Sequence, residues 1–187
     1  LMNHSSFTDM KLAYGIFYPK KLGIVTSVDA MTGILGKLMR LLGCTPTHKY
    51  ITDLSLFKDI EYMLKKNKTS VLMYPEAGYS FDGCATTLPR KMGVLMKRLG
   101  VPVVTVITQG AFHRDPLYNM LQIRNVKVSA HVKCIATAEE VKSKSVAELD
   151  ALLEEAFSFD NFAWQRDNKI SIDVPFRADG LHRILYK

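Results

Sequence analysis

The sequence predicts a three-layer α/β protein in which a mostly parallel or mixed central sheet is flanked by helices. Short apolar runs typical of buried strands alternate along the chain with longer segments whose apolar residues recur every three or four positions. The run 101–107 is apolar almost throughout, as expected of a central strand buried on both faces. With 187 residues, the chain is long enough for one domain with a substantial core. We expect that domain to cover residues 1–158, with residues 159–187 as an extension docked on it.

The formal net charge of +7 is unevenly distributed. Residues 1–100 carry 14 Lys and Arg against 7 Asp and Glu, whereas residues 101–187 carry 11 against 11, so the whole excess lies in the first part. A basic region suggests an anionic partner such as a phosphate group, an anionic membrane surface or an acidic carrier, although solubility alone also explains it. Nucleic acid is not expected as a partner, because the basic residues are not interleaved with aromatic ones.

Cysteine usage and hydropathy indicate where the protein works. Cys44, Cys84 and Cys134 are odd in number and form no C-x-x-C pair, which argues against a zinc site or a disulfide framework and fits the reducing cytoplasm. There is no signal-peptide pattern and no apolar run long enough to span a bilayer, so any membrane contact would be peripheral. Residues 1–3 resemble the end of a strand whose beginning is missing.

The first element with a helical pattern covers residues 6–18 and ends at Pro19. Ser6 followed by Asp9 is the arrangement of a capping box at its start. A short buried strand is expected at residues 22–26.

Residues 31–42 predict an amphipathic helix that ends at Gly43. Its apolar residues fall on one broad face, and Lys37 and Arg40 fall on the other. Such a helix can lie on anionic lipid, or it can be a core helix with a solvated back; at this short length we favour the core helix by about two to one.

The same patterns predict the remaining elements. They are an extended piece at residues 45–51, a helix capped by Asp53, a buried strand at residues 69–74, a helix opened by Pro89, a half-buried strand near a sheet edge at residues 126–134, and a helix opened by a capping box of Ser145 and Glu148.

Two polar stretches follow predicted strands, and the carboxyl ends of parallel strands gather at one edge of a sheet. The first is Asn3–Asp9 (NHSSFTD), in which His4 can act as a general base if Asp9 reaches its imidazole from the first helical turn. Alternatively, Asp9 only caps the helix and His4 is a surface residue. Ser5 or Ser6 as a nucleophile would lack the G-x-S-x-G elbow.

The second stretch is Pro75–Ser80 (PEAGYS). Ala77 and Gly78 are small enough for a substrate to approach the backbone beside Glu76, and amides at such a turn can bind an anion or a developing oxyanion. An ordinary strand-to-loop turn has the same composition. Lys91, at the start of the next predicted helix, suggests a phosphate partner.

Together these motifs resemble the glycerolipid acyltransferase family, whose best-known members are 1-acylglycerol-3-phosphate acyltransferases. Asn3–Asp9 is similar to the family's N-H-x-x-x-x-D block, and Tyr74–Ser80 (YPEAGYS) is similar to its F-P-E-G-T-R-S block. Residues 43–49 align with the second block, G-x-h-h-h-x-R, and Val101–Val106 (VPVVTV) with the fourth, V-P-h-h-P-h. Four blocks occur in the family's order over residues 1–107.

The resemblance implies a fold of the glycerol-3-phosphate acyltransferase kind and a role for each matching residue. His4 would deprotonate the acceptor hydroxyl, and Asp9 would support it. The acceptor-binding residues would be Lys49, Glu76, Ala77, Gly78, Tyr79, Ser80 and Lys91.

Departures from the family pattern concern the acceptor. Lys49 stands where the second block has Arg, which keeps the charge but loses the two-pronged hydrogen bonding. Tyr79 stands where the third block has Arg, Ala77 and Gly78 stand for its Gly-Thr, and Thr105 replaces the second proline of the fourth. We therefore expect the reaction to persist with an acceptor other than plain lysophosphatidic acid. The family's membrane-binding helical part before the first block has no counterpart in this sequence.

The expected function is an O-acyltransferase that moves an acyl chain from an acyl thioester to a hydroxyl of a lysophospholipid-like acceptor. The co-substrate would be acyl-CoA or acyl-ACP (acyl carrier protein), with no further cofactor and no metal. We expect a cytoplasmic protein, peripheral on the inner face of an anionic membrane, where the helix at residues 31–42 and the basic first half of the chain would help to dock it. The alternatives are a non-catalytic lipid- or acyl-carrier-binding protein of the same fold, and a thioester or lipid hydrolase.

Overall fold

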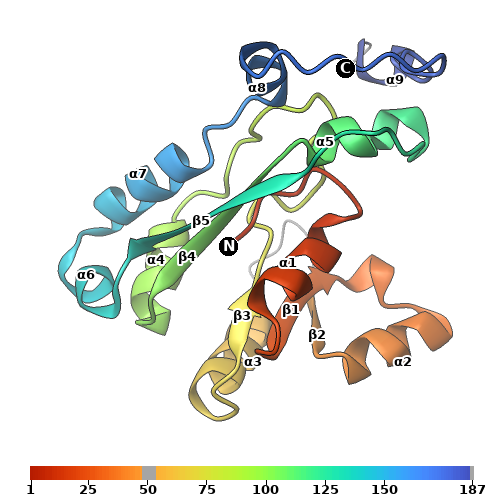
Figure 1. The fold of residues 1–187 in the computed structure, drawn as a ribbon. Coiled ribbons are helices and arrows are strands. Elements are labelled where there is room, and N and C mark those ends of the chain that lie inside the picture. The colour runs from red at the N-terminus through yellow and green to blue at the C-terminus, as the bar shows by residue number, and fades with distance from the viewer. Residues whose placement is uncertain (48–53, 186–187) are drawn as a thin grey trace.

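The computed structural model describes residues 1–47 and 54–185. Three parallel strands, β1 (Leu22–Ser27), β2 (Cys44–Thr47) and β3 (Ser70–Leu72), pair in the order β2-β1-β3. Strands β4 (Val103–Gln109) and β5 (Ser129–Ala136) form an antiparallel pair (Figure 1).

The start of the chain joins these two sheets. The Met2 amide donates to the Met73 carbonyl at 3.0 Å, just past β3, and Met2 forms a parallel bridge with Val106 of β4. The predicted strand end at residues 1–3 therefore lies between β3 and β4. The result is the mixed, mostly parallel central sheet that the sequence predicts.

Helices and short helical turns surround the sheet (Figure 1). They are α1 (Asp9–Phe17), η1 (Val28–Ala30), α2 (Gly33–Leu41), α3 (Leu54–Lys65), α4 (Met92–Leu99), α5 (Ala111–Arg114), η2 (Leu117–Asn119), α6 (Ala138–Ser143), α7 (Val146–Ala156), α8 (Asn161–Asp167) and α9 (His182–Leu185).

Strand β1 shows why the fold has three layers. Ile24 packs in one core cluster with Ala13 of α1. Its neighbour Gly23 faces α3, where a Cβ atom would lie 2.4 Å from the sulfur of Met63. Because successive strand residues point to opposite faces, α1 and α3 cover opposite faces of the sheet. The three-layer α/β prediction is confirmed.

A second core cluster lies between β4, β5 and the helices α4, α6 and α7. Its fully buried members include Val141, Leu149 and Leu153. The predicted capping box at the start of α7 is formed, with Ser145 Oγ accepting from the Glu148 amide and the Glu148 carboxylate accepting from the Ser145 amide. Strand β5 lies at the sheet edge, as predicted, but it covers Ser129–Ala136 instead of residues 126–134 and is mostly exposed rather than half-buried.

The predicted start of α4 is wrong by three residues. The helix begins at Met92 rather than at Pro89, because Lys91 adopts the left-handed conformation (φ 65°), which a right-handed helix cannot contain. The amide of Gly93 in its first turn donates to Asp150 Oδ1 at 2.6 Å.

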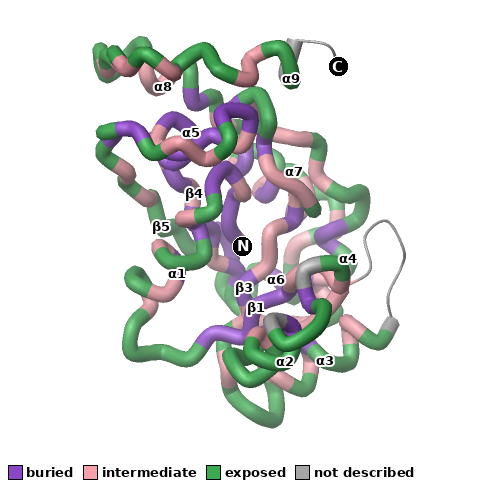
Figure 2. The backbone as a smooth tube through the Cα atoms, turned by 90° about the vertical axis from the view of Figure 1, so that its right-hand side faces the viewer, coloured by how far each residue is buried: buried purple, intermediate pink, exposed green. Residues whose placement is uncertain are grey.

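The preference for a core position of the helix at residues 31–42 is also wrong. In α2, Ile34 and Leu41 are 87% and 83% exposed, and Leu38 is exposed by half. Figure 2 shows α2 as exposed over most of its length. Gly43 ends the helix as predicted, with φ 88°.

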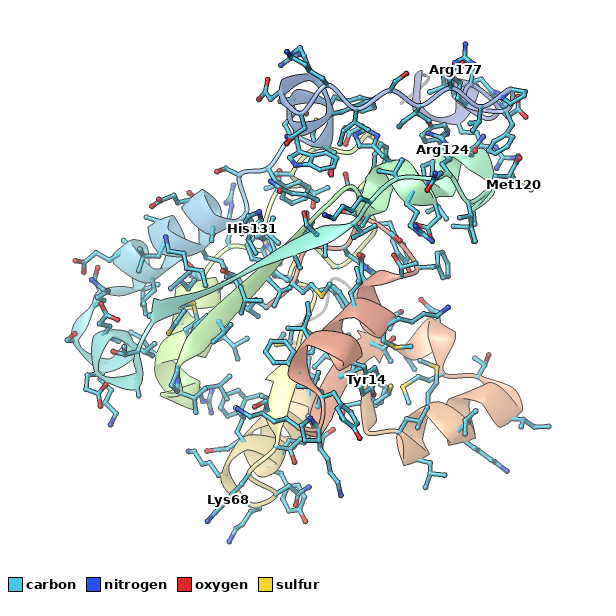
Figure 3. All side chains as sticks on the ribbon, viewed as in Figure 1. Tyr14, Lys68, Met120, Arg124, His131 and Arg177 are labelled. Carbon is cyan, nitrogen blue, oxygen red and sulfur yellow. The ribbon has the colours of Figure 1, made fainter. Side chains whose placement is uncertain are left out.

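The C-terminal segment contacts the rest of the protein through polar groups. The Asn119 side-chain amide donates to the carbonyls of Phe176 and Asp179, both at 2.8 Å. Arg124 Nη2 donates to the Arg177 carbonyl at 3.0 Å, and Figure 3 shows these two residues side by side. The domain boundary at residue 158 stays a prediction. Among the described helices, none is both long and apolar enough to cross a bilayer.

Candidate active site

The first polar stretch is fixed to the end of β4 by Asn3. This residue is fully buried, and its Oδ1 accepts hydrogen bonds from the amide of Thr108 at 2.8 Å and from its hydroxyl at 3.1 Å. Its Nδ2 donates to the Thr108 carbonyl and to Ser5 Oγ. Asn3 therefore sets the position from which His4 leaves the sheet.

Asp9 lies at the start of α1 and is fully buried. Its Oδ2 accepts from the amides of Ser5 and Ser6 at 2.7 and 2.8 Å, and the same oxygen lies 3.1 Å from His4 Nδ1. One carboxylate oxygen thus orders the loop and holds the imidazole. With the Nδ1 proton directed at Asp9, Nε2 carries the lone pair that can accept a proton.

The predicted capping box at Ser6 is only half formed. The Asp9 carboxylate reaches back to the Ser6 amide, but the N-cap residue is Thr8, which makes no side-chain cap. Ser6 Oγ instead contacts Asp115 Oδ1 at 2.5 Å and Thr8 Oγ1 at 2.6 Å. Asp9 therefore orders the loop before α1 and orients the imidazole, but it does not cap the helix.

The loop at residues 75–80 meets the first stretch, as the strand order predicted. The amide of His4 donates to Glu76 Oε2 at 2.7 Å, and the carbonyl of His4 accepts from the Ser80 amide at 2.8 Å. Glu76 Oε1 accepts from Thr86 Oγ1 at 3.0 Å. Burial raises the pKa of the Glu76 carboxyl. Glu76 therefore positions the main chain of His4.

Aromatic rings cover the imidazole. The ring centroids of Tyr74 and Tyr79 lie 4.1 and 3.7 Å from that of His4, with interplanar angles of 25° and 28°. Two rings this close cannot share one face, so they lie on opposite faces and leave only the edge of the imidazole open. Phe7 continues the stack, with its centroid 5.0 Å from that of Tyr79.

The hydroxyl groups of both tyrosines remain protonated. Burial, with the charge of Asp9 adding to it, raises the pKa of Tyr79 to about 12 and raises the pKa of Tyr74 further. Tyr74 Oη and Asp9 Oδ1 are both buried without a hydrogen-bond partner within the part of the chain that the structure describes.

The turn at Ala77 and Gly78 leaves backbone groups accessible. Ala77 has φ 56°, and its amide donates to the Tyr74 carbonyl at 3.1 Å. The position of a Cβ atom on Gly78 has nothing within 4 Å. Ser80 is buried, and its hydroxyl donates to the Cys84 carbonyl at 2.7 Å, so this side chain is used within the loop.

Comparisons with known proteins identify the family and the fold of the chain. The family model described as Acyltransferase matches residues 1–109, which is more than half of the chain. The chain belongs to the acyltransferase family. Among solved structures, the chain is similar to the 1-acyl-sn-glycerophosphate (LPA) acyltransferase PlsC from Thermotoga maritima, with a TM-score of 0.55 and 18% sequence identity. The match covers 92% of this chain and 66% of that one, so the chain spans slightly less than two thirds of that protein. No curated protein matches the sequence.

Two of the residues expected to bind the acceptor are not among the described contacts of His4. Lys49, at the arginine position of the acyltransferase second block, lies outside the described residues. Lys91 is exposed on the turn before α4, where the helix end is already occupied by the Asp150 carboxylate. The start of α4 is therefore less suited to bind a phosphate than the sequence suggested.

Three contacts of the candidate site were not singled out from the sequence. Tyr74 stands in the third block and contacts the imidazole face, but a block pattern does not show stacking. Thr86 and Asp115 reach the site from 10 and 109 residues away from their partners Glu76 and Ser6. No short-range signal marks either residue.

Two cavities lie elsewhere. One of about 640 Å³ lies between β4, β5 and α8, and one of about 490 Å³ lies between the sheet and the helices α3 and α4. His4 lines neither of them. The His4 side chain, 19% exposed, instead faces the surface.

Proposed function

We propose that this member of the acyltransferase family transfers an acyl chain from an acyl thioester to a hydroxyl of a lysophospholipid-like acceptor, with His4 as general base. The observation that carries the proposal is the contact of 3.1 Å between His4 Nδ1 and the buried Asp9 Oδ2. It supplies a base with a fixed tautomer at the edge of a small, partly exposed site.

In the proposed reaction, the acceptor hydroxyl donates its proton to His4 Nε2 as its oxygen attacks the thioester carbonyl carbon. The C–S bond then breaks, and the imidazolium returns the proton to the leaving thiolate. The products are an ester and a free thiol. Asp9 stabilises the imidazolium that forms between the two steps.

The turn after Glu76 offers donors for the developing oxyanion. Within the described residues, the amides of Gly78 and Tyr79 make no hydrogen bond to another protein group. Amides held in a turn next to the base are suited to a negative oxygen. We assign Gly78 and Tyr79 to this role, while Glu76 and Ser80 hold the main chain of His4 in place.

The acceptor is proposed to depend less on a phosphate group than lysophosphatidic acid does. Tyr79 takes the position of the third-block arginine, and its neutral ring stacks on His4 instead of offering a cation. A lysolipid with a larger or uncharged headgroup fits this site better. The donor is proposed to be acyl-CoA or acyl carrier protein, and the place of action the inner face of the cytoplasmic membrane, where the protein is peripheral.

The test is acyl transfer by the purified protein, followed by mass spectrometry, from acyl-CoA and from acyl carrier protein to a panel of lysophospholipids. His4→Ala should form no ester while its circular dichroism stays that of the wild type. The matched control is His131→Ala, which removes an exposed histidine hydrogen-bonded to Gln109. Comparable turnover by His4→Ala would overturn the mechanism.

The same assay separates the competing functions. Release of free thiol without acceptor would indicate a hydrolase. Vesicle binding without any transfer would indicate a lipid-binding protein of this fold. A strong and exclusive preference of the wild type for lysophosphatidic acid would refute the acceptor proposal, and Tyr79→Arg is expected to shift selectivity toward that substrate.

A further inference from the structure

Helix α2 and the residue that follows it carry exposed apolar side chains next to basic residues. Ile34 is 87% exposed, Leu41 83%, Leu42 56% and Leu38 51%. Isolated exposed apolar residues are normal, but four within nine positions form a patch that water solvates poorly.

The patch faces away from the protein. Gly36 is buried, and a Cβ atom there would lie 2.2 Å from the Met31 carbonyl oxygen in the turn before the helix. Residues two positions apart in an α-helix point in directions about 200° apart around its axis. Ile34 and Leu38 are each two positions from Gly36, so they lie roughly opposite it. Side chains of α2 project outward from the body of the molecule in Figure 3. Met39 packs against the core cluster that contains Met31, so the helix packs through its Gly36 and Met39 side and leaves Ile34, Leu38 and Leu41 without a cover.

The charged residues of α2 are all basic. Lys37 and Arg40 are exposed on α2, and the sequence contains no acidic residue between Asp29 and Asp53. Lys20 and Lys21 are also exposed. They directly precede β1, which pairs with the strand that follows α2.

The segment that contains Lys20 and Lys21 is held beside α2 by the sheet. A Cβ atom on Gly43 would lie 3.3 Å from the Leu22 carbonyl oxygen, and the Gly43 carbonyl accepts from the Ile24 amide at 3.1 Å. On its other side, α2 is joined to α1 through Tyr14, whose hydroxyl donates to the Leu42 carbonyl at 3.4 Å.

We infer that α2 is the membrane-contacting element of this protein. It lies in the plane of an anionic lipid surface, with Ile34, Leu38 and Leu41 among the acyl chains and Lys37 and Arg40 at the headgroups. An amphipathic helix with basic residues beside an apolar face binds in this way. The choice of a lipid surface as the partner rests on the proposed function, because the proposed acceptor is a lipid. The outward position of the apolar patch does not depend on that function.

A second copy of the chain is a poorer occupant. In a two-fold symmetric contact, a patch meets the same patch of the partner. Lys37 and Arg40 would then approach their own copies with no carboxylate on α2 to compensate them. An anionic lipid surface satisfies both the apolar and the basic residues.

The experiment is vesicle flotation of the whole protein without acyl donor. Wild-type protein should bind vesicles of phosphatidylglycerol and phosphatidylcholine more tightly than vesicles of phosphatidylcholine alone. The double variant I34Q/L41Q keeps the charge and should lower the partition coefficient at least about tenfold. K37Q/R40Q keeps the apolar face and should remove most of the preference for phosphatidylglycerol.

The matched control is I123Q, which changes a side chain that is 69% exposed. Ile123 is close in sequence to Met120, which Figure 3 places far from α2, so binding should not change. Circular dichroism and sedimentation are measured for every variant. Wild-type binding that I34Q/L41Q retains, or no wild-type binding to either vesicle, would overturn the inference. So would a wild-type dimer that I34Q/L41Q converts to a monomer with equal vesicle binding.

The outcome is separable from that of the proposed function. Binding lost in I34Q/L41Q from a protein that transfers no acyl group would support α2 and refute the enzyme. Acyl transfer to a short-chain, water-soluble lysolipid by a protein that binds no vesicles would support the enzyme and refute the membrane-binding role of α2.

Discussion

Replacement of Asp9 by Asn tests how the site holds its base. The substitution keeps the size of the side chain and removes its charge. Asp9 Oδ2 accepts from two backbone amides and lies 3.1 Å from His4 Nδ1. An asparagine oxygen can keep the amide bonds, but it no longer stabilises an imidazolium, and its NH₂ group can turn the imidazole to the other tautomer.

The magnitude follows from the distance. Two unit charges 3.1 Å apart interact by about 5 kcal/mol at the effective dielectric constant of about 20 that suits protein sites. If the imidazolium is fully formed in the transition state, the rate should fall by up to about 10⁴. The effect on stability should be smaller, about 2 kcal/mol or less. Hydrogen bonds to a neutral oxygen are weaker than those to a carboxylate, but a buried charge no longer has to be desolvated.

The assay is kcat/KM for acyl transfer, paired with urea unfolding of the same preparation. Asp150→Asn is the matched control, because Asp150 also accepts from a backbone amide, that of Gly93, outside the site. It should lose stability without a comparable loss of activity. A folded Asp9→Asn protein that keeps more than about a tenth of the wild-type kcat/KM would refute the orienting role of Asp9.

Three further predictions concern stability and are measured by urea unfolding. Asn3→Ala should lower the free energy of unfolding by about 2–3 kcal/mol, because it leaves the buried amide of Thr108 without an acceptor; no measurable loss would show that water replaces Asn3. Gly93→Ala should cost about 1–3 kcal/mol, because the new Cβ atom would lie 2.5 Å from the Val146 carbonyl oxygen and push α4 from α7; a neutral effect would mean that the helices shift freely. Burial lowers the pKa of His113 below its ordinary value of 6.5. As the pH falls, His113 therefore takes up a proton in the unfolded chain before it does so in the folded protein. The wild type should lose stability as the pH falls through the pKa of the unfolded chain. His113→Gln should lose less stability than the wild type between about pH 7.5 and about pH 5.5, and an equal loss would contradict the burial argument.

The meeting of the two polar stretches could be predicted because it depends only on strand order. Both stretches follow strands of one sheet, and parallel strands bring their carboxyl ends together. The hydrogen bonds from His4 to Glu76 and Ser80 are a consequence of that topology. The partners Thr86 and Asp115 could not be predicted in the same way, because each comes from a loop whose path depends on tertiary packing.

The error at α2 has a physical cause of the same kind. Periodicity in a sequence identifies an apolar face, but it does not say whether that face meets protein or another apolar phase. The packing side is marked by Met39, which packs against the core cluster, and by Gly36, whose lack of a side chain lets the helix approach the Met31 carbonyl in the turn before it. A glycine inside a helical pattern reads as a weakness in the sequence, whereas here it marks the packing side.

The residues around His4 suggest that the departures from the family pattern act together. An arginine at position 79 would offer a cation to a phosphate, whereas the neutral Tyr79 stacks between His4 and Phe7. Tyr74 occupies the other face of the imidazole, so an acceptor hydroxyl can reach His4 only at the ring edge. In the proposed reaction, a site built this way would select its acceptor by shape and by the hydroxyl it presents, rather than by pairing with a charge. The hydrogen bonds that hold His4 and Asp9 are independent of position 79, so the base can be kept while the acceptor changes.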